Sequence, residues 1–343
     1  MILCAQGVMS TIPTTFNRNF PSYTVIGGRE SFKSTGLSVV LLNRGGRYAR
    51  RSLFHDLEKT GFDTVVSVEP EPAHYDLDEL SARFPFVRFV IPHTRISLGE
   101  QINLAVSEID SPLFFVLWND LKMIAGGTAQ RMAERLTRSA ESNGNGKGKS
   151  HFMRLCTVPV IQNSRHDTIP TIIAPVLRQK KIQTRFLNSS SEGLPSLYPF
   201  DGVGIYDKER FIKLGGFDGT IKNSFWQLMD FGFRAYLWGE EISLSLTLKF
   251  SYEAAIPSED NSAGNDYSRF YLKNLAPVFR NDCAHLPVSR FPGFLFNANN
   301  GVFGAWDDFS ESRLWVNTNS FRWRCNPKTI ASYWNLETSN KEN

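Results

Sequence analysis

The chain has 343 residues, of which 41% are hydrophobic, and a formal net charge of only +4 at neutral pH. A chain of this length can bury one large core or the cores of two domains, and its scattered charge excludes the basic stripe of a nucleic-acid-binding protein. One basic cluster attracts either phosphates or an anionic membrane surface, or else it forms a solvated helix face. It consists of Arg44, Arg47, Arg50 and Arg51.

The four cysteines are too widely spaced for a zinc site or a disulfide scaffold, which agrees with a reducing cytoplasm. They are Cys4, Cys156, Cys283 and Cys325. Residues 1–9 lack the positive flank and the apolar core of an export signal. Because no run of about 18 apolar residues occurs, we expect no membrane-spanning helix. We therefore predict a cytoplasmic protein, and peripheral association with the inner face of the membrane is left open.

The N-terminal half of the chain alternates between strands and helices. Residues 1–36 are polar and rich in turn-forming residues, and we expect an irregular arm there. Strands are then predicted at 38–43, 64–69, 87–91 and 113–117, with helices at 48–60, 75–83 and 97–109. This alternation is typical of an α/β fold with a mostly parallel sheet, right-handed crossovers and helices on both faces.

The C-terminal half has a less regular pattern. A glycine-rich loop is expected at 141–150, short β-like runs at 151–175 and an irregular stretch at 179–199. Further elements are predicted as strands at 200–206 and 242–250 and as helices at 208–214, 224–238 and 267–278. We therefore divide the chain into a main domain, 37–256, with halves 37–125 and 151–256, and a helical, aromatic extension, 257–343.

Two distant stretches carry the functional signal. Residues 113–120 form a hydrophobic strand that ends in acid, and the carboxyl end of a buried parallel strand is where open α/β sheets bind ligands. Asp120, at the end of this strand, is thus positioned for chemistry. The second stretch runs from Gly215-Gly-Phe-Asp218 through Trp226 to Arg234.

From 37 to 255 the sequence resembles the family 2 glycosyltransferases, which have the GT-A fold and use nucleotide sugars. The resemblance rests on five short motifs in the order that is typical of the family. They are Ser38-Val-Val with Asn43-Arg44; Gly99 with Asn103 and Ala105; the strand that ends at Asp120; Gly215-Gly-Phe-Asp218; and Asp230 with Arg234.

The resemblance implies that Asp120 holds Mg²⁺ or Mn²⁺ against the donor diphosphate, where the ion acts as a Lewis acid. The family usually places two acids around one residue at this position. Here Trp118 stands in the first position and Asn119 in the second, so only the last acid is present. The alternative is a strand-end aspartate that caps a turn or helix.

The same resemblance places the donor nucleotide at the first turns of the sheet. Glu69 closes the second strand, where the family has an aspartate that binds the nucleoside, and its alternative is a solvent-exposed loop acid. Asn43 and Arg44 contact the base or phosphate, or they are a turn asparagine and a surface arginine. Gly99, Asn103 and Asn119 complete the predicted donor site.

The block at 215–234 is the predicted acceptor side, where a carboxylate must take the proton of the attacking hydroxyl. The family's motif here has further acids, but this chain has Gln227 and Leu228, which leaves Asp230 as the predicted base. Asp201 and Asp218 are alternatives, as is a loss of catalysis. Since Asp230 and Arg234 are spaced i, i+4, a structural ion pair is the other interpretation.

The remaining predicted acceptor-binding residues are Asp201, Gly202, Tyr206, Trp226 and Arg234. Glycines in the 201–206 segment either let backbone approach a ligand or serve packing in the strand. Trp226 is either a platform for an acceptor sugar or a part of the core.

Taken together, these residues predict a metal-dependent glycosyltransferase that moves a sugar from a nucleotide donor to a glycan or lipid-linked acceptor, inverting its anomeric centre, in surface-polysaccharide assembly. Two other interpretations stay open. One is a GT-A module without catalysis that binds a nucleotide sugar or a partner glycosyltransferase. The other is a sugar nucleotidyltransferase. The sequence does not predict the oligomeric state.

Overall fold

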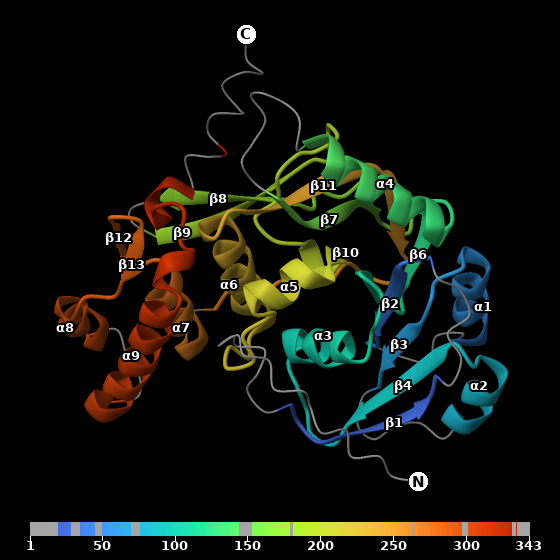
Figure 1. Ribbon diagram of the computed structural model, residues 1–343, viewed down its shortest axis with the longest axis horizontal. Coiled ribbons are helices and arrows are strands. Elements are labelled where there is room, and N and C mark those ends of the chain that lie inside the picture. Colours follow the sequence, from blue (N-terminus) through green and yellow to red (C-terminus); the bar gives the residue numbers. More distant parts are fainter. Residues whose placement is uncertain are drawn as a thin grey trace.

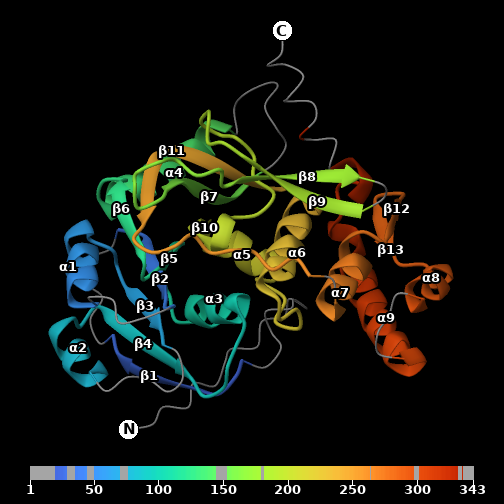
Figure 2. The same cartoon turned by 180° about the vertical axis from the view of Figure 1, so that it is seen from behind.

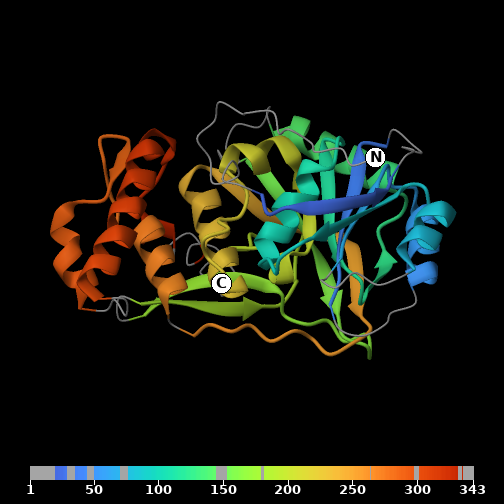
Figure 3. The same ribbon diagram turned by 90° about the horizontal axis from the view of Figure 1, so that it is seen from below.

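The computed structural model describes residues 20–28, 35–44, 50–69, 76–143, 153–178, 181–262, 264–296, 301–330 and 334. A twisted sheet with helices around it forms the larger part of the molecule, and a helical lobe lies at one end (Figures 1 and 3). Residues 144–150 of the glycine-rich loop predicted at 141–150, Arg47 and most of the N-terminal arm lie outside the described residues, and 141–143 belong to a helix instead of the loop.

The central sheet has nine strands in the order β1-β4-β3-β2-β5-β10-β7-β11-β6. These strands are β1 (Tyr23–Gly27), β2 (Leu37–Leu42), β3 (Val65–Val68), β4 (Val87–Pro92), β5 (Leu113–Trp118), β6 (Leu121–Ala125), β7 (Met153–Gln162), β10 (Gly204–Asp207) and β11 (Glu240–Tyr252). β4, β3, β2 and β5 are parallel, which confirms the predicted α/β class. β10 runs antiparallel to β5 and β7, so the second half of the sheet mixes directions.

Helices cover both faces of the parallel strands. They are α1 (Arg50–Thr60), α2 (Leu77–Arg83), α3 (Leu98–Ser107), α4 (Ala129–Asn143), α5 (Lys208–Leu214) and α6 (Ser224–Leu237). α1 and α2 lie on one side of β2 and β3, and α3 lies on the other (Figures 1 and 2). α3 begins at a capping box in which Ser97 and Glu100 satisfy each other's backbone N–H groups. α6 is buried all round except at its first residue, which explains its unusually apolar sequence.

The strand order creates a crevice at the carboxyl ends of two neighbouring strands. The chain passes from β2 outward to β3 and β4 and then returns to place β5 on the opposite side of β2. Such a reversal leaves the loops after the two central strands pointing apart, and ligands of open α/β sheets bind in the gap between them. Asn43 and Arg44 follow β2, and Asn119 and Asp120 follow β5, so both segments border this crevice.

Several predicted boundaries need correction. The stretch at 179–199, expected to be irregular, contains the strand β9 (Lys181–Leu187), and the helix expected at 267–278 is α7 (Asn265–Asn274). Tyr23–Gly27 of the expected irregular arm is β1, which pairs antiparallel with β4 at the sheet edge. Its short β-branched run sits among polar residues that hide the strand pattern. Residues 200–206 are not one strand. Phe200–Gly202 is a 3₁₀ turn in which Asp201 has φ 55°, and β10 starts only at Gly204.

The C-terminal part packs directly on the main domain. Its elements are α7 (Asn265–Asn274), β12 (Val278–Arg280), β13 (Cys283–His285), α8 (Phe291–Leu295) and α9 (Gly301–Thr318). α7 packs between α6 and α9. A separate hairpin of β8 (Ile172–Arg178) and β9 (Lys181–Leu187) reaches toward this lobe (Figures 1 and 2). Among the helices that the structure describes, none has the length and apolar character needed to cross a bilayer.

Candidate functional site

The guanidinium group of Arg44 lies in the crevice, held by acids from two other segments. Its Nε and Nη2 donate to the two carboxylate oxygens of Asp120, at 2.9 and 3.2 Å. Its Nη1 lies 2.7 Å from Oδ2 of Asp201. Asp120 is 2% exposed, so this fork occupies a carboxylate that is almost closed to solvent. The segments that follow the paired strands β2 and β5 are thus joined by an ion pair between residues 44 and 120.

Two aromatic rings complete the surroundings of Arg44. The guanidinium carbon lies 4.2 Å above the ring centroid of Trp118 and 5.4 Å from that of Tyr252. The hydroxyl of Tyr252 donates to Oδ2 of Asp201 at 2.9 Å, and the indole Nε1 of Trp118 donates to the Asp201 carbonyl. Both interactions fix the 3₁₀ turn whose positive φ turns Asp201 toward Arg44. A strained backbone at a ligand-binding position is a recurrent feature of functional sites.

A cavity of about 420 Å³ opens beside this cluster, and Arg44, Trp118 and Asp201 form one wall of it. The start of α6 and the segment after β11 also line the cavity, and they contribute Lys222 and Glu259. Lys222 is largely exposed and its Nζ binds Oε1 of Glu100 at 2.6 Å. The cavity therefore brings Arg44 and Lys222 together with three carboxylates, those of Asp201, Glu259 and Asp260, at the carboxyl end of β5.

Two of the three carboxylates that line the cavity, Asp201 and Glu259, have raised pKa values. Burial raises the pKa of Asp201 to about 6, although the charge of Arg44 opposes the shift. Burial also raises the pKa of Glu259 to about 7, while its hydrogen bond from the hydroxyl of Tyr198, at 3.0 Å, opposes the change. A carboxyl group with a pKa near neutrality is well matched to accept a proton from a hydroxyl. Sequence reasoning missed Glu259 because it stands in an irregular segment without a motif.

The predicted nucleoside residues form a second cluster at the ends of β2 and β3. Glu69 accepts hydrogen bonds from Arg50 Nη2 at 2.7 Å and from Ser67 Oγ at 2.7 Å, and Asn43 Nδ2 donates to the Val68 carbonyl at 2.8 Å. Burial raises the pKa of Glu69, and the charge of Arg50 opposes that shift. Glu69 is 2% exposed, so the exposed loop acid of the alternative interpretation is wrong. Nη1 of Arg50 is buried and has no hydrogen-bond partner among the described residues.

Gly99 and Asn103, predicted for the donor site, instead join α3 to the Gly-Gly-Phe-Asp turn. Asn103 and the backbone of Phe217 exchange two hydrogen bonds, at 2.8 and 2.9 Å. The backbone N–H of Gly99 donates to Gln227 Oε1 at 2.7 Å. A Cβ atom on Gly99 would lie 2.3 Å from Cβ of Phe217, so only glycine fits. In this structure both residues position the turn and α6. Asn119 does border the crevice, where its Oδ1 accepts the Arg44 N–H.

Asp230, the predicted base, is fully buried within a charged cluster. Its oxygens lie 2.8 Å from Arg234 Nε, 2.9 Å from Lys273 Nζ and 2.8 Å from Asn274 Nδ2. Burial alone would raise the pKa of Asp230, but the charges of Arg234 and Lys273 outweigh it and lower the pKa. A buried carboxylate with a lowered pKa and three donors is a poor acceptor for a hydroxyl proton. The structural ion pair, the second interpretation, is what the structure contains.

The charged cluster also includes Asp218 of the Gly-Gly-Phe-Asp turn. Lys273 Nζ lies 2.7 Å from Asp218 Oδ2, and Arg234 donates to the backbone carbonyls of Leu214 and Gly216 at 2.7 Å each. These contacts tie α6, α7 and the turn into one unit. Arg234, predicted to bind the acceptor, is 0% exposed and acts within this unit.

Three other predicted acceptor residues lie in the core: Gly202, Tyr206 and Trp226. Tyr206 stacks on Phe114 with centroids 5.0 Å apart, and its hydroxyl donates to the carbonyl of Gly202. Trp226 is buried against α7 and donates through Nε1 to the carbonyl of Ser262. The core interpretation of Trp226 therefore matches the structure. Asp201 is the predicted acceptor-side residue that faces the cavity.

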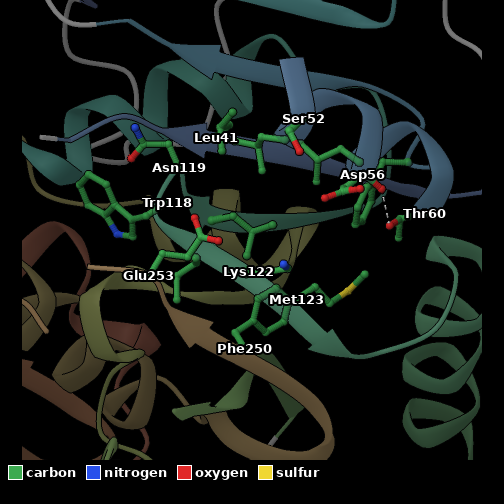
Figure 4. Close-up of a pocket in the computed structure, with 15 residues that line it drawn as sticks. Leu41, Ser52, Asp56, Thr60, Trp118, Asn119, Lys122, Met123, Phe250 and Glu253 are labelled. Atoms are coloured by element: carbon green, nitrogen blue, oxygen red, sulfur yellow. Dashed lines mark hydrogen bonds between the residues drawn. The ribbon is translucent and has the colours of Figure 1, made fainter. Parts of the chain in front are cut away.

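A second cavity, of about 390 Å³, lies between α1 and the strands β5 and β6. Trp118 and Asn119 stand at one end of it, and Asp56 and Thr60 of α1 stand at the other (Figure 4). Trp118 lines both cavities. One basic residue, Lys122, lines the second cavity, whereas Arg44 and Lys222 line the first. The second cavity is therefore less suited to a diphosphate.

Comparison with solved structures identifies the architecture. The chain aligns with a crystal structure of GalNAc-T7 with UDP, GalNAc and Mn²⁺ at a TM-score of 0.52 and 12% sequence identity. The chain has a GT-A glycosyltransferase fold. The alignment covers 89% of this chain and 57% of that protein, so the chain spans little more than half of the neighbour's length.

Weaker alignments include S. aureus TarS with UDP-GlcNAc, with a TM-score of 0.43, 10% identity and coverage of 82% of this chain and 72% of that one. We draw nothing from scores this low. No family profile matches the sequence, and no curated protein matches it. At these identities the comparison establishes the fold, and the predicted membership of family 2 stays an expectation.

The GT-A fold raises the question of whether the residues at the crevice suit a divalent ion. Among the described residues, no group of three or more His, Cys, Asp or Glu side chains is placed to hold a metal. A divalent ion bound to Asp120 would also lie about 4 Å from the guanidinium of Arg44. At an effective dielectric constant of about 20, the repulsion would be on the order of 8 kcal/mol. The predicted Mg²⁺ or Mn²⁺ does not fit the residues in this arrangement.

Proposed function

We propose that the protein is a glycosyltransferase that moves a sugar from a nucleoside diphosphate sugar to a hydroxyl of a glycan or lipid-linked acceptor. The observation that carries the proposal is the cavity at the carboxyl end of β5, whose lining combines the basic residues Arg44 and Lys222 with the carboxylates of Asp201 and Glu259. Cationic groups suit a diphosphate, and a carboxylate with a near-neutral pKa suits an attacking hydroxyl. The GT-A fold supports the same reaction class, although fold by itself does not establish function.

The reaction we propose is a single in-line displacement. The acceptor oxygen forms a bond to C1 of the donor sugar while the bond from C1 to the β-phosphate oxygen breaks, with its electron pair staying on that oxygen. The hydroxyl proton passes to the carboxylate of Glu259, and the nucleoside diphosphate leaves with the developing negative charge near Arg44. Attack from the face opposite the leaving group inverts the anomeric carbon.

We assign the nucleoside to the cluster at the ends of β2 and β3. Asn43, Glu69 and Arg50 lie one strand away from Asp120, and the buried Nη1 of Arg50 has hydrogen-bonding capacity that the described residues do not satisfy. A ligand oxygen would satisfy it. A lipid-linked acceptor would place the reaction at the inner face of the membrane, in the cytoplasm, as a step of surface-polysaccharide assembly.

A GT-A module without catalysis is the second candidate, and one observation favours it. The one acid of the motif that this chain keeps, Asp230, is bound in the buried cluster with Arg234 and Lys273. Such a module would bind the nucleotide sugar without transferring the sugar. Glu259 is the group that decides between the two, because a binding module has no need of a proton acceptor in the cavity.

The test is saturation binding of UDP, GDP and dTDP, followed by release of nucleoside diphosphate from the matching sugar nucleotides. A glycosyltransferase should bind one nucleotide preferentially. It should also hydrolyse the matching sugar nucleotide slowly, to sugar and nucleoside diphosphate, even without an acceptor. Binding without any release of the diphosphate, with oligosaccharide and polyprenyl-phosphate-sugar acceptors present, would favour the binding module. If none of the nucleotides binds, the proposal is wrong.

A further inference from the structure

The position of Arg44 points to a property of the donor site beyond sugar transfer itself. The guanidinium lies between two carboxylates from different parts of the chain, 2.9 Å from Asp120 and 2.7 Å from Asp201. A cation between two acids at the carboxyl end of β5 is what the GT-A resemblance predicts of a metal ion. Here the cation is part of the protein.

The residues around Arg44 suit a guanidinium and not a metal. Trp118 stands where the resemblance predicts an acid, and its ring lies under the guanidinium carbon at 4.2 Å. An indole ring offers a divalent ion no oxygen ligand, whereas it is the best aromatic partner of a flat organic cation. The loss of one acid and the gain of an aromatic platform therefore have a common explanation.

Arg44 is also held as a permanent charge. Burial alone would lower its pKa, but the hydrogen bond to Asp120 and the charge of Asp201 outweigh that effect and raise it above the usual arginine value. The three contacts to the two acids engage three of the five guanidinium N–H groups. Two N–H groups stand outside these contacts, on a side chain that lines the cavity. Guanidinium N–H groups bind phosphate oxygens with two parallel hydrogen bonds.

We propose that Arg44 binds the diphosphate of the donor in place of a divalent cation, so that donor binding and sugar transfer need no metal ion. This inference rests on the proposed function. Asp120 and Asp201 are then positioning residues: they hold the guanidinium against Trp118, and they do not coordinate an ion. As the C1–O bond breaks, the charge that develops on the β-phosphate oxygen is balanced by the N–H groups of Arg44.

The experiment is binding of UDP, GDP and dTDP to the full chain in EDTA and again in Mn²⁺, by calorimetry. The wild-type protein should bind its preferred nucleotide with the same affinity, within about threefold, in both buffers. Arg44→Ala should weaken binding in EDTA about 10- to 100-fold, the range for a hydrogen bond between charged groups. Added guanidinium chloride at low millimolar concentration should restore part of the loss. Arg165→Ala, at an exposed position after β7 and outside both cavities, is the matched control and should bind as the wild type does.

Removal of Arg44 should also create a metal requirement. In Arg44→Ala, the two carboxylates lose their shared cation, so Mn²⁺ should strengthen nucleotide binding in this variant although it has no effect on the wild type. The inference is overturned if the wild-type protein binds nucleotide in Mn²⁺ and loses it in EDTA, a result that leaves the proposed function intact. The absence of nucleotide binding in both buffers would instead overturn the proposed function together with the inference. The wild-type comparison requires no variant, so it decides even if Arg44→Ala does not fold.

Discussion

Replacement of Asp230 by asparagine separates a structural role from a catalytic one. Asparagine keeps the shape of the side chain but removes its charge, so Arg234 loses its carboxylate partner and Lys273 keeps one of its two, Asp218. All four side chains are at most 1% exposed. Breaking a buried ion pair on one side costs about 3–5 kcal/mol, because the other charge stays desolvated. We expect Asp230→Asn to lower the free energy of unfolding by this amount.

The assay is denaturant unfolding monitored by tryptophan fluorescence. Nucleotide affinity is measured separately on the folded protein. Asp56→Asn is the control, since Asp56 is exposed and its contact with Lys59, at 4.0 Å, is weak. It should change stability by less than about 1 kcal/mol. Lys273→Met in the Asp230→Asn background removes the excess positive charge, so the double variant should lose less stability than the sum of the two single variants.

The reasoning would be refuted by an Asp230→Asn protein that is as stable as the wild type and yet transfers sugar about 10²–10⁴ times more slowly, the signature of a lost general base. Acid titration gives an independent check. The pKa of Asp230 is lowered in the folded state, so its contribution to stability is present above the usual aspartate pKa. That contribution should be lost as the pH falls through the lowered value.

Two further predictions concern the cavity and the packing of α3. Glu259, with a pKa of about 7, must be deprotonated to accept a proton, so kcat should rise with pH through neutrality. Glu259→Gln should remove this limb and lower kcat about 10²–10⁴-fold; a limb that persists in the variant would assign it to another group. Gly99→Ala places a Cβ atom 2.3 Å from Phe217, and it should lower stability by about 1–3 kcal/mol in a melting experiment. Gly264→Ala, with nothing within 4 Å of its added Cβ, is the control, and equal melting of the two variants would contradict the packing argument.

The sequence predicted the parallel half of the fold because its strands are continuous apolar runs. All six residues of β2 are buried, and the alternation with helices leaves few other topologies. It also placed Asp120 at the end of the central strand correctly. β1 was missed because an edge strand of five residues, only partly buried, carries no strong pattern.

The site was harder to predict because its contacts join residues far apart in the chain. The ion pair between Arg44 and Asp120 spans 76 positions, so no local spacing indicates it. The i, i+4 spacing of Asp230 and Arg234 did indicate an ion pair, but the third charged partner, Lys273, comes from a helix that the motif does not include. Glu259 has no motif, and only its place on the cavity wall reveals it.

The docking of α7 bears on how the molecule can be divided. Lys273 and Asn274 of α7 belong to the predicted extension, and they contact Asp218 of the Gly-Gly-Phe-Asp turn and Asp230 of α6. In a truncated protein that ended near residue 257, Asp230 would keep Arg234, but Asp218 would lose both Lys273 and Arg269. The segment after β11 therefore cannot be removed without loss: it supplies buried ion-pair partners to the rest of the fold. We expect both parts to unfold in one cooperative transition.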